Sequence, residues 1–388
     1  MNFKIPAVIF LLFFSSSLFA QSEFNKIEKA DEGLYFMYFD SSASKSTIVE
    51  FNEYLVMIEV PIIDKGGGAT ILVDDIAGGE KVLRSLKNHF PKKPLKYILH
   101  SHWHLHSISS ISPFINNNVK IVSTKNNFDV LSKFMEPASV QTNMNSFIFV
   151  EGDSLVISDG TNEIIAYRFE QKDYPSTPTK DYLYFYIPKH NCMHAACMYT
   201  KWMGEPVDGK PVLSGREENL YAFIKSKNIN PEFIIRLPNE KAELNGLQSY
   251  EGLEFTNNNG IKSSDILKQY LALDALSLKQ NRDEIVKDAI IKNIPASIIN
   301  SCVYAELRKK ELDRALSYAY IQAMMNPSDA NAWDTLGEVY YFMGEYEVAQ
   351  SYLKQKQRMF PNNHEGGEEV WKEDLENHKK IWEKDGKF

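Results

Sequence analysis

Cysteine and positive charge are both scarce in this sequence. Three cysteines among 388 residues cannot form the disulfide framework of a small secreted scaffold. Lysine and arginine number 43 against 51 aspartates and glutamates, so the chain carries a net charge of −8. This balance argues against nucleic acid as a general partner, because binding to nucleic acid needs a basic surface. Hydrophobic residues at 44% and charged residues at 24% are ordinary for globular proteins, which excludes collagen, coiled coil and long disorder. The length predicts two or three domains.

The chain also lacks an apolar run long enough to span a membrane. Lys4 is followed by an apolar stretch over residues 5–14 and by small residues over 15–20. A spanning helix needs about 20 apolar residues, which disfavours the alternative of an uncleaved membrane anchor. A positive start, a short apolar segment and small residues are typical of a secretory signal peptide. We therefore expect residues 1–20 to be removed, giving a secreted or periplasmic protein without a membrane span.

Strand and helix patterns alternate over residues 22–255. Residues 96–99 and 182–187 are predicted strands, because they are short, apolar and rich in aromatic or β-branched side chains. Residues 80–89 are a predicted helix, because their apolar side chains recur at helical spacing. The turn-forming run at residues 257–260 is predicted to be a linker. The pattern indicates a layered body of helices and strands before that linker.

The remaining chain, residues 261–388, is helical in pattern to its end. Within residues 330–363 a set of side chains recurs at fixed offsets: Trp333, Leu336, Gly337, Tyr340, Ala349 and Pro361. One 34-residue period earlier, residues 296–329 show a weaker version of the same pattern. The two units together, residues 296–363, resemble tetratricopeptide repeats.

Helix pairs of this kind bury their apolar faces only against neighbouring helices. Two units make little concave surface, so a helical cap or a dimerisation layer is the favoured interpretation, and a peptide-binding groove is the alternative. The predicted partners are accordingly a protein, a peptide or a second copy of the chain, bound through the helical repeats. No nucleic-acid partner is expected.

Four histidines at alternating positions follow the predicted strand 96–99. They are His100, His102, His104 and His106. Imidazole is a common metal ligand, and a spacing of two lets neighbouring side chains converge from a turn. The alternative is a polar edge strand whose histidines have ordinary hydrogen-bond partners. The pattern alone leaves both interpretations open.

The segment that starts at Pro94 resembles the metallo-β-lactamase superfamily. Members have a strand that ends in Thr-His-x-His-x-Asp-His, after a Pro-x-Lys-Tyr-type start. Aligned on this strand, Ser101 matches the threonine, and His102 and His104 match the first two metal histidines. The earlier run Ile-Glu-Val-Pro resembles the family's Ile-Asp-x-Pro, and implies that Glu59 holds the histidine loop by a hydrogen bond.

Other ligand positions of the family are altered in this sequence. In the same register His106 replaces the aspartate and Ser107 replaces the third histidine. The position of the next histidine falls on Pro178, and the last falls on Asn239. Cys197 matches the cysteine ligand found in one subclass of true β-lactamases. The lost aspartate orients and deprotonates the nucleophile in the family, and a histidine beside a cation cannot simply replace it as a base.

The resemblance implies an α+β fold, with an αββα metallo-β-lactamase-like sandwich over residues 22–255 followed by a small all-α helical-repeat domain over 261–388. If metal binds, the predicted ligands are His102, His104, His106 and Cys197, with His194 also possible. The alternative for Cys197 and His194 is a half-buried strand with cysteine as a small hydrophobic residue. The cofactor expected is one zinc ion at most, or none, and no catalytic residue is assigned.

Three functions fit these residues. The favoured one is an exported metallo-β-lactamase-like protein with an altered metal site and impaired or unusual catalysis. The alternative is a secreted zinc-dependent hydrolase that uses metal-activated water on an ester, amide or sulfate bond. Metal capture by the histidine run is weaker, because no carboxylates lie near it in the sequence.

Overall fold

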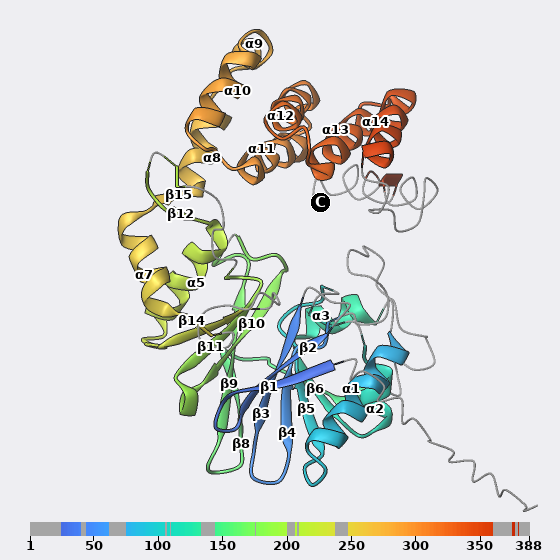
Figure 1. Cartoon of the computed structure of the whole chain (residues 1–388), viewed down its shortest axis with the longest axis vertical. Coiled ribbons are helices and arrows are strands. Elements are labelled where there is room, and N and C mark those ends of the chain that lie inside the picture. The colour runs from blue at the N-terminus through green and yellow to red at the C-terminus, as the bar shows by residue number, and fades with distance from the viewer. Residues whose placement is uncertain are drawn as a thin grey trace, which may run out of the picture.

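The computed structural model describes residues 25–39, 44–61, 75–104, 107–108, 110–132, 144–174, 176–199, 206–207, 209–236, 247–359, 375–376 and 379. The predicted signal peptide, His106 and Asn239 lie outside these residues. Figure 1 shows two bodies along the long axis, a sheet-containing body built from the N-terminal part of the chain and a body of helices above it.

The first sheet follows the chain order. Its strands are β1 (Asn25–Asp31), β2 (Leu34–Phe39), β3 (Lys45–Glu50), β4 (Leu55–Ile58), β5 (Leu95–Leu99), β6 (Lys120–Ser123) and β7 (Phe147–Phe149). Strands β1 to β4 pair antiparallel, whereas β4 to β7 pair parallel and therefore need crossover connections. Those crossovers contain α1 (Ile76–His89), α2 (Ser112–Asn116) and α3 (Lys125–Leu131). The predicted strand 96–99 is confirmed as β5.

The second sheet has the strand order β14-β13-β11-β10-β9-β8. Its strands are β8 (Ser154–Ser158), β9 (Glu163–Glu170), β10 (Asp181–Ile187), β11 (Cys192–Ala196), β13 (Phe233–Arg236) and β14 (Leu247–Ser249). Only β11 and β13 pair parallel, and α5 (Gly215–Ser226) lies between them in the sequence. The predicted strand 182–187 is confirmed as β10. A further helix, α7 (Tyr250–Asn259), follows β14.

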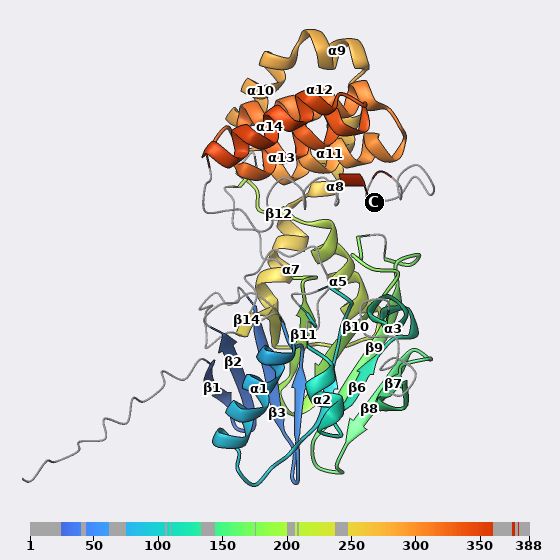
Figure 2. The ribbon, with the colours of Figure 1, turned by 90° about the vertical axis from the view of Figure 1, so that its right-hand side faces the viewer.

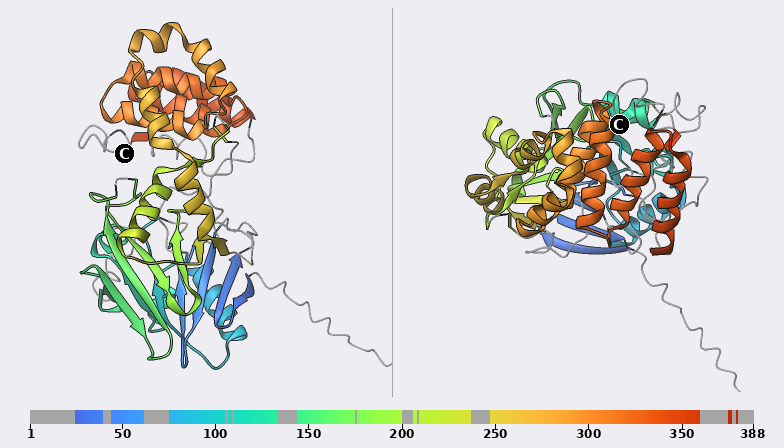
Figure 3. Two further views of the ribbon diagram at one scale, coloured as in Figure 1. Left: turned by 90° about the vertical axis from the view of Figure 1, so that its left-hand side faces the viewer. Right: turned by 90° about the horizontal axis from the view of Figure 1, so that it is seen from above.

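Apolar clusters define four layers, in the order helix, sheet, sheet, helix. Val82 of α1 shares an outer cluster with Ile98 of β5, and Phe223 of α5 shares the opposite outer cluster with Tyr184 of β10. A third cluster, which includes Leu99 and Leu183, fills the space between the sheets. Figure 2 shows α1 and α2 on one side of the sandwich, and Figure 3 shows α5 and α7 over the second sheet. The predicted α+β class is confirmed.

Two local predictions are corrected by the structure. The predicted helix 80–89 begins earlier, at Ile76, because the Asp75 side chain caps it by accepting a hydrogen bond from the Gly78 N–H. The predicted linker 257–260 forms the last turn of α7 and its C-cap. Gly260 closes that turn where a Cβ atom would lie 2.4 Å from the Thr256 carbonyl oxygen, so the position has no room for a side chain.

The helical body contains α8 (Ser263–Leu271), α9 (Ala275–Gln280), α10 (Arg282–Ile291), α11 (Ala296–Arg308), α12 (Leu312–Met325), α13 (Ala330–Phe342) and α14 (Tyr346–Met359). The helix pairs α11–α12 and α13–α14 start at Ala296 and Ala330, which is the predicted 34-residue period. Seen from above in Figure 3, these helices lie side by side. Assignment to the tetratricopeptide family stays a prediction.

The two bodies are joined through a short parallel pair. Strand β12 (Val212–Leu213) pairs with β15 (Ile261–Lys262), and Val207 and Val212 belong to the apolar cluster of the helical body. In the described part of the chain, no helix is long and apolar enough to cross a membrane.

Candidate metal site

The candidate site lies where strands of both sheets end or begin. The histidine loop (residues 100–104 and 107–108) follows β5, Cys197 follows β11, and β10 begins at Asp181. The Ser101 carbonyl ties this loop to the second sheet, because it accepts hydrogen bonds from Leu183 N (3.0 Å) and from the Asn127 side chain (3.3 Å). These bonds fix the start of the histidine loop relative to β10.

His102 and Cys197 meet in the interior. Nε2 of His102 lies 3.4 Å from Sγ of Cys197, and Nδ1 of the same ring lies 2.7 Å from the Ser101 hydroxyl oxygen. His102 is fully buried and Cys197 is almost so. Burial raises the pKa of the Cys197 thiol, a shift that the nearby Arg216 guanidinium opposes. The sequence-predicted pair is thus brought together from opposite sheets.

Backbone strain places Cys197. Ala196 has a φ of +45°, in the left-handed region that non-glycine residues seldom adopt, and the register of β11 against β13 shifts between His194 and Ala196. This irregularity breaks the alternation of the strand, so a residue after it does not follow the strand's facing pattern. Such strain is characteristic of functional positions.

His104 lies beside this pair, with its ring centroid 4.7 Å from that of His102. The side chain is half-buried. No group of three or more histidine, cysteine, aspartate or glutamate side chains with metal-holding geometry occurs among the described residues. The predicted ligand His106 lies outside them.

Glu59 and two serines form a buried polar chain behind His102. Glu59 accepts hydrogen bonds from the Ser107 hydroxyl and from Ser101 N (3.1 Å), and the two serine hydroxyls lie 3.3 Å apart. The predicted role of Glu59 in holding the histidine loop is confirmed by these contacts. Burial raises the pKa of Glu59 to about 8, although the hydrogen bonds from both serines oppose the shift. The hydroxyl of Ser107, which the resemblance places at the third metal histidine, therefore donates its hydrogen bond to Glu59.

Tyr182 is a site residue that sequence reasoning missed. Its ring stacks on His102 with centroids 4.8 Å apart. Its hydroxyl accepts from Cys197 N (3.2 Å) and donates to Ala195 O (3.3 Å), and lies 3.5 Å from the Cys197 sulfur. Burial raises the pKa of this phenol well above its usual value, so it stays neutral. The available signal was its place at the start of β10, directly after the turn that carries Pro178.

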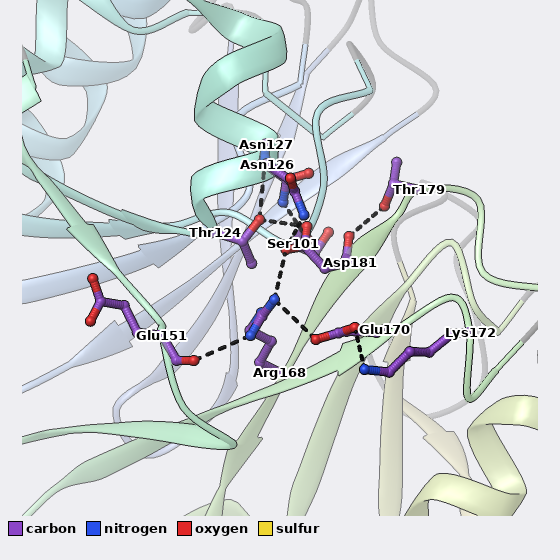
Figure 4. A network of polar contacts seen from close by, with 10 residues as sticks. All are labelled: Ser101, Thr124, Asn126, Asn127, Glu151, Arg168, Glu170, Lys172, Thr179 and Asp181. Carbon is purple, nitrogen blue, oxygen red and sulfur yellow. Dashed lines mark hydrogen bonds and ion pairs between the residues drawn. The ribbon is translucent and has the colours of Figure 1, made fainter.

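A second network that the sequence did not reveal fixes that same turn (Figure 4). The Asp181 carboxylate accepts from the Thr124 hydroxyl (2.6 Å), from the Asn126 side chain (3.0 Å) and from Arg168 (3.4 Å). The Thr179 hydroxyl donates to the Asp181 carbonyl (2.6 Å). The carboxylate contacts of Asp181 hold the end of this turn. The side chain of Pro178, which the resemblance places at a metal histidine, has no donor atom for a metal.

His194 lies on β11 opposite Phe185. Phe185 and Tyr182 are three residues apart on β10, which is about 10 Å along the strand. Burial, reinforced by the positive charge of Lys45, lowers the pKa of His194 to about 3, so the ring is neutral. His190 lies elsewhere, with Nδ1 2.8 Å from the Asp31 carboxylate. His100 is buried, and its Nδ1 lies within hydrogen-bond distance of the Ser123 hydroxyl oxygen, at 3.0 Å.

A zinc site needs at least three protein ligands, and the described residues bring two of the predicted donors, His102 and Cys197, into contact. Zinc–sulfur and zinc–nitrogen bonds of about 2.3 and 2.0–2.1 Å at a tetrahedral angle place the two ligand atoms about 3.5 Å apart. The His102–Cys197 separation of 3.4 Å agrees with that spacing. The family's second set of ligands does not fit, because Pro178 cannot coordinate and Ser107 is bonded to Glu59.

Comparison with known proteins gives similarity to solved metallo-β-lactamase structures. A metallo-β-lactamase from Pontibacter korlensis is 12% identical with a TM-score of 0.41, over 60% of this chain and 97% of that one. A mono-zinc form from Pseudomonas aeruginosa is 11% identical with a TM-score of 0.41, over 60% and 93%. One from Hirschia baltica is 12% identical with a TM-score of 0.41, over 60% and 96%. No protein-family model and no curated protein sequence matches the chain.

Proposed function

We propose that this chain is an exported metallo-β-lactamase-like protein with an altered site that binds one zinc ion at most. The observation that carries the proposal is the 3.4 Å distance between Cys197 Sγ and His102 Nε2. Two other positions that hold metal histidines in the family are occupied here by Pro178 and by Ser107, whose hydroxyl donates to Glu59. In this proposal His102 and Cys197 are the central donors, and His104 or His106 completes the set.

Hydrogen bonds pre-orient the proposed donors. The Ser101 hydroxyl fixes the Nδ1 side of His102, which leaves Nε2 directed at the thiol. Tyr182 covers one face of the imidazole and holds the backbone of Cys197. Partners that orient first ligands in this way are typical of metal sites. When bound, zinc would supply a Lewis acid that lowers the pKa of a coordinated water.

The same contacts support impaired or unusual catalysis. The resemblance places His106 at the family's aspartate, and Glu59, the acid behind His102, is fully buried and accepts hydrogen bonds from two serines. Burial keeps Glu59 protonated at neutral pH, so it is a poor candidate for a general base. We therefore favour a site that binds metal without the family's two-metal hydrolysis. Zinc-dependent hydrolysis of an ester, amide or sulfate bond is the alternative.

Export and partner binding belong to the same proposal. Residues 1–20 are proposed to direct the chain to the periplasm or outside the cell. The helical body is proposed to bind a protein or peptide or to self-associate. A large apolar cluster joins α8 to α14, and this shared core would hold the helices together as a binding surface.

The deciding experiment measures metal stoichiometry in the purified mature chain. We expect at most one zinc ion per chain, and we expect the cobalt-substituted protein to show a sulfur-to-cobalt absorption band. Cys197→Ser should abolish that band and His102→Ala should abolish stoichiometric binding. His89→Ala, an exposed histidine on α1, is the matched control and should change neither.

Three outcomes would contradict the proposal. Two tightly bound zinc ions per chain would indicate a two-metal site like that of the family. Unchanged stoichiometry in both site variants would place the metal elsewhere. Turnover of a chromogenic β-lactam, ester, amide or sulfate that is lost with zinc and with Cys197→Ser, but not with His89→Ala, would establish the hydrolase alternative.

A further inference from the structure

A cavity at the opposite end of β5 from the candidate site has no part in the proposed function. It has a volume of about 520 Å³ and lies between α1, the turn at residues 91–94, the start of β5 and the end of α2. Figures 1 and 2 both place α1 and α2 beside each other at the lower end of the sandwich. Leu95 lines the cavity, whereas Leu99, four residues further along the strand, leads into the histidine loop.

The floor of the cavity is apolar. Leu83, Leu86 and Phe90 of the α1 segment line it together with Leu95 and Val119. Leu86, Phe90 and Val119 are buried, and Leu83 and Leu95 are half-buried, so the apolar surface is recessed. A volume of this size lies within the 300–1,000 Å³ range of small-molecule sites, which are mostly apolar with a few polar groups.

The rim is cationic, in contrast to the net charge of −8 for the whole chain. Arg84, Lys87, Lys92 and Lys93 line the cavity, and Glu80 is the acidic lining residue. Arg84 lies 3.9 Å from Glu80, and Lys93 pairs with Glu50 at 2.9 Å. Within the part of the chain that the structure describes, no hydrogen bond or ion pair engages the side chain of Lys87 or Lys92.

We propose that this cavity binds a small amphiphilic anion, a free carboxylate with an alkyl or aromatic tail. The tail would cover the recessed leucine and phenylalanine side chains, and the carboxylate would meet the ammonium groups of Lys87 and Lys92. A bilayer is the less suitable source of such chemistry, because a membrane surface requires protruding apolar side chains and the apolar lining here is recessed.

The probe is dodecanoate, kept below its micellar concentration and titrated calorimetrically into the purified mature protein. We expect saturable binding that is at least about tenfold tighter than that of dodecanol or dodecyltrimethylammonium, and that weakens with added salt. Lys87→Glu/Lys92→Glu should weaken dodecanoate binding at least about tenfold. The matched control Lys29→Glu/Lys279→Glu changes two exposed lysines elsewhere by the same charge and should bind normally.

A second variant tests the floor without altering the charge. Leu83→Gln replaces a half-buried side chain and should weaken dodecanoate while leaving binding of acetate, which has no tail, unchanged. Equal affinity for the three head groups, full binding by Lys87→Glu/Lys92→Glu, or binding to anionic vesicles but not to dodecanoate would each overturn the proposal. Zinc stoichiometry should be the same in all these variants, so failure here is separable from failure of the proposed metal site.

Discussion

Cys197 and His102 are 95 residues apart in the sequence, yet Cys197 Sγ lies 3.4 Å from His102 Nε2. The two side chains come from opposite sheets, and neither belongs to a regular strand. One follows the end of β5 and the other follows the strained Ala196 at the end of β11. Their approach therefore depends on the packing of the sheets and not on local sequence.

Removing metal should leave the fold intact. The space between the sheets is filled by its own apolar cluster, so the sandwich does not need an ion in the way that a zinc finger does. We expect a chelator to strip the proposed zinc without changing the far-ultraviolet circular dichroism spectrum. Zinc content should be measured on the same sample. Unfolding on chelation would show that the metal is structural.

Sequence patterns predicted the elements of this site better than its contacts. Strands 96–99 and 182–187 were predictable because short apolar runs between turn residues have few alternatives. The approach of His102 to Cys197 followed from a family register, since composition and spacing do not pair residues across two sheets. That register also gave Glu59 its place behind the histidine loop.

The contacts that were missed depend on register and strain. Tyr182 contacts His102 and Cys197 because β10 starts beside both residues. Secondary-structure propensities do not predict such a contact between segments that are distant in the sequence. Asp181 contacts residues of two other segments: Thr124 and Asn126 at the start of α3, and Arg168 on β9. His194 looked similar to Cys197 in sequence, but it precedes the irregularity at Ala196 and stays on the regular strand.

Removing the Tyr182 hydroxyl should destabilise the protein. Tyr182→Phe leaves the buried Cys197 N–H without its acceptor and the Ala195 carbonyl without this donor. The loss of partners for buried groups costs about 1–3 kcal/mol, so we expect a decrease of that size in the free energy of unfolding from urea denaturation. Tyr167→Phe is the control and should have little effect, because Tyr167 is a half-buried residue on β9. Equal stability of the two variants would rule out this role.

The Asp181 network should be similarly sensitive. Asp181→Asn removes the charge that three donors share, and one amide oxygen cannot accept all of their hydrogen bonds. Hydrogen bonds to charged groups contribute about 1.5–3 kcal/mol each, so we expect at least one such contribution to be lost from the free energy of unfolding. Asp173→Asn, exposed in the adjacent turn, should be nearly neutral. A neutral Asp181→Asn would mean that the network does not hold the turn.

Buried titratable groups predict a fall in stability on the alkaline side of neutrality. Burial raises the pKa of Glu59 to about 8 from an ordinary value of 4.5, so between these values the folded chain binds a proton that the unfolded chain has released. The Glu59 contribution is therefore complete below pH 4.5 and is lost as the pH rises toward 8. Burial lowers the pKa of His100 and His194 from 6.5 to about 3, so their effect is confined to pH values below 6.5.

The window from pH 6.5 to 8 isolates the Glu59 effect. There we expect the free energy of unfolding to decrease by up to about 1.4 kcal/mol per pH unit, measured by urea denaturation at fixed ionic strength. Glu59→Gln cannot titrate and should flatten this slope, whereas Glu53→Gln, an exposed residue nearby, should retain it. A flat profile in the unmodified protein would mean that Glu59 is already ionised when folded. In that case Ser101 and Ser107 would stabilise its charge more strongly than burial opposes it.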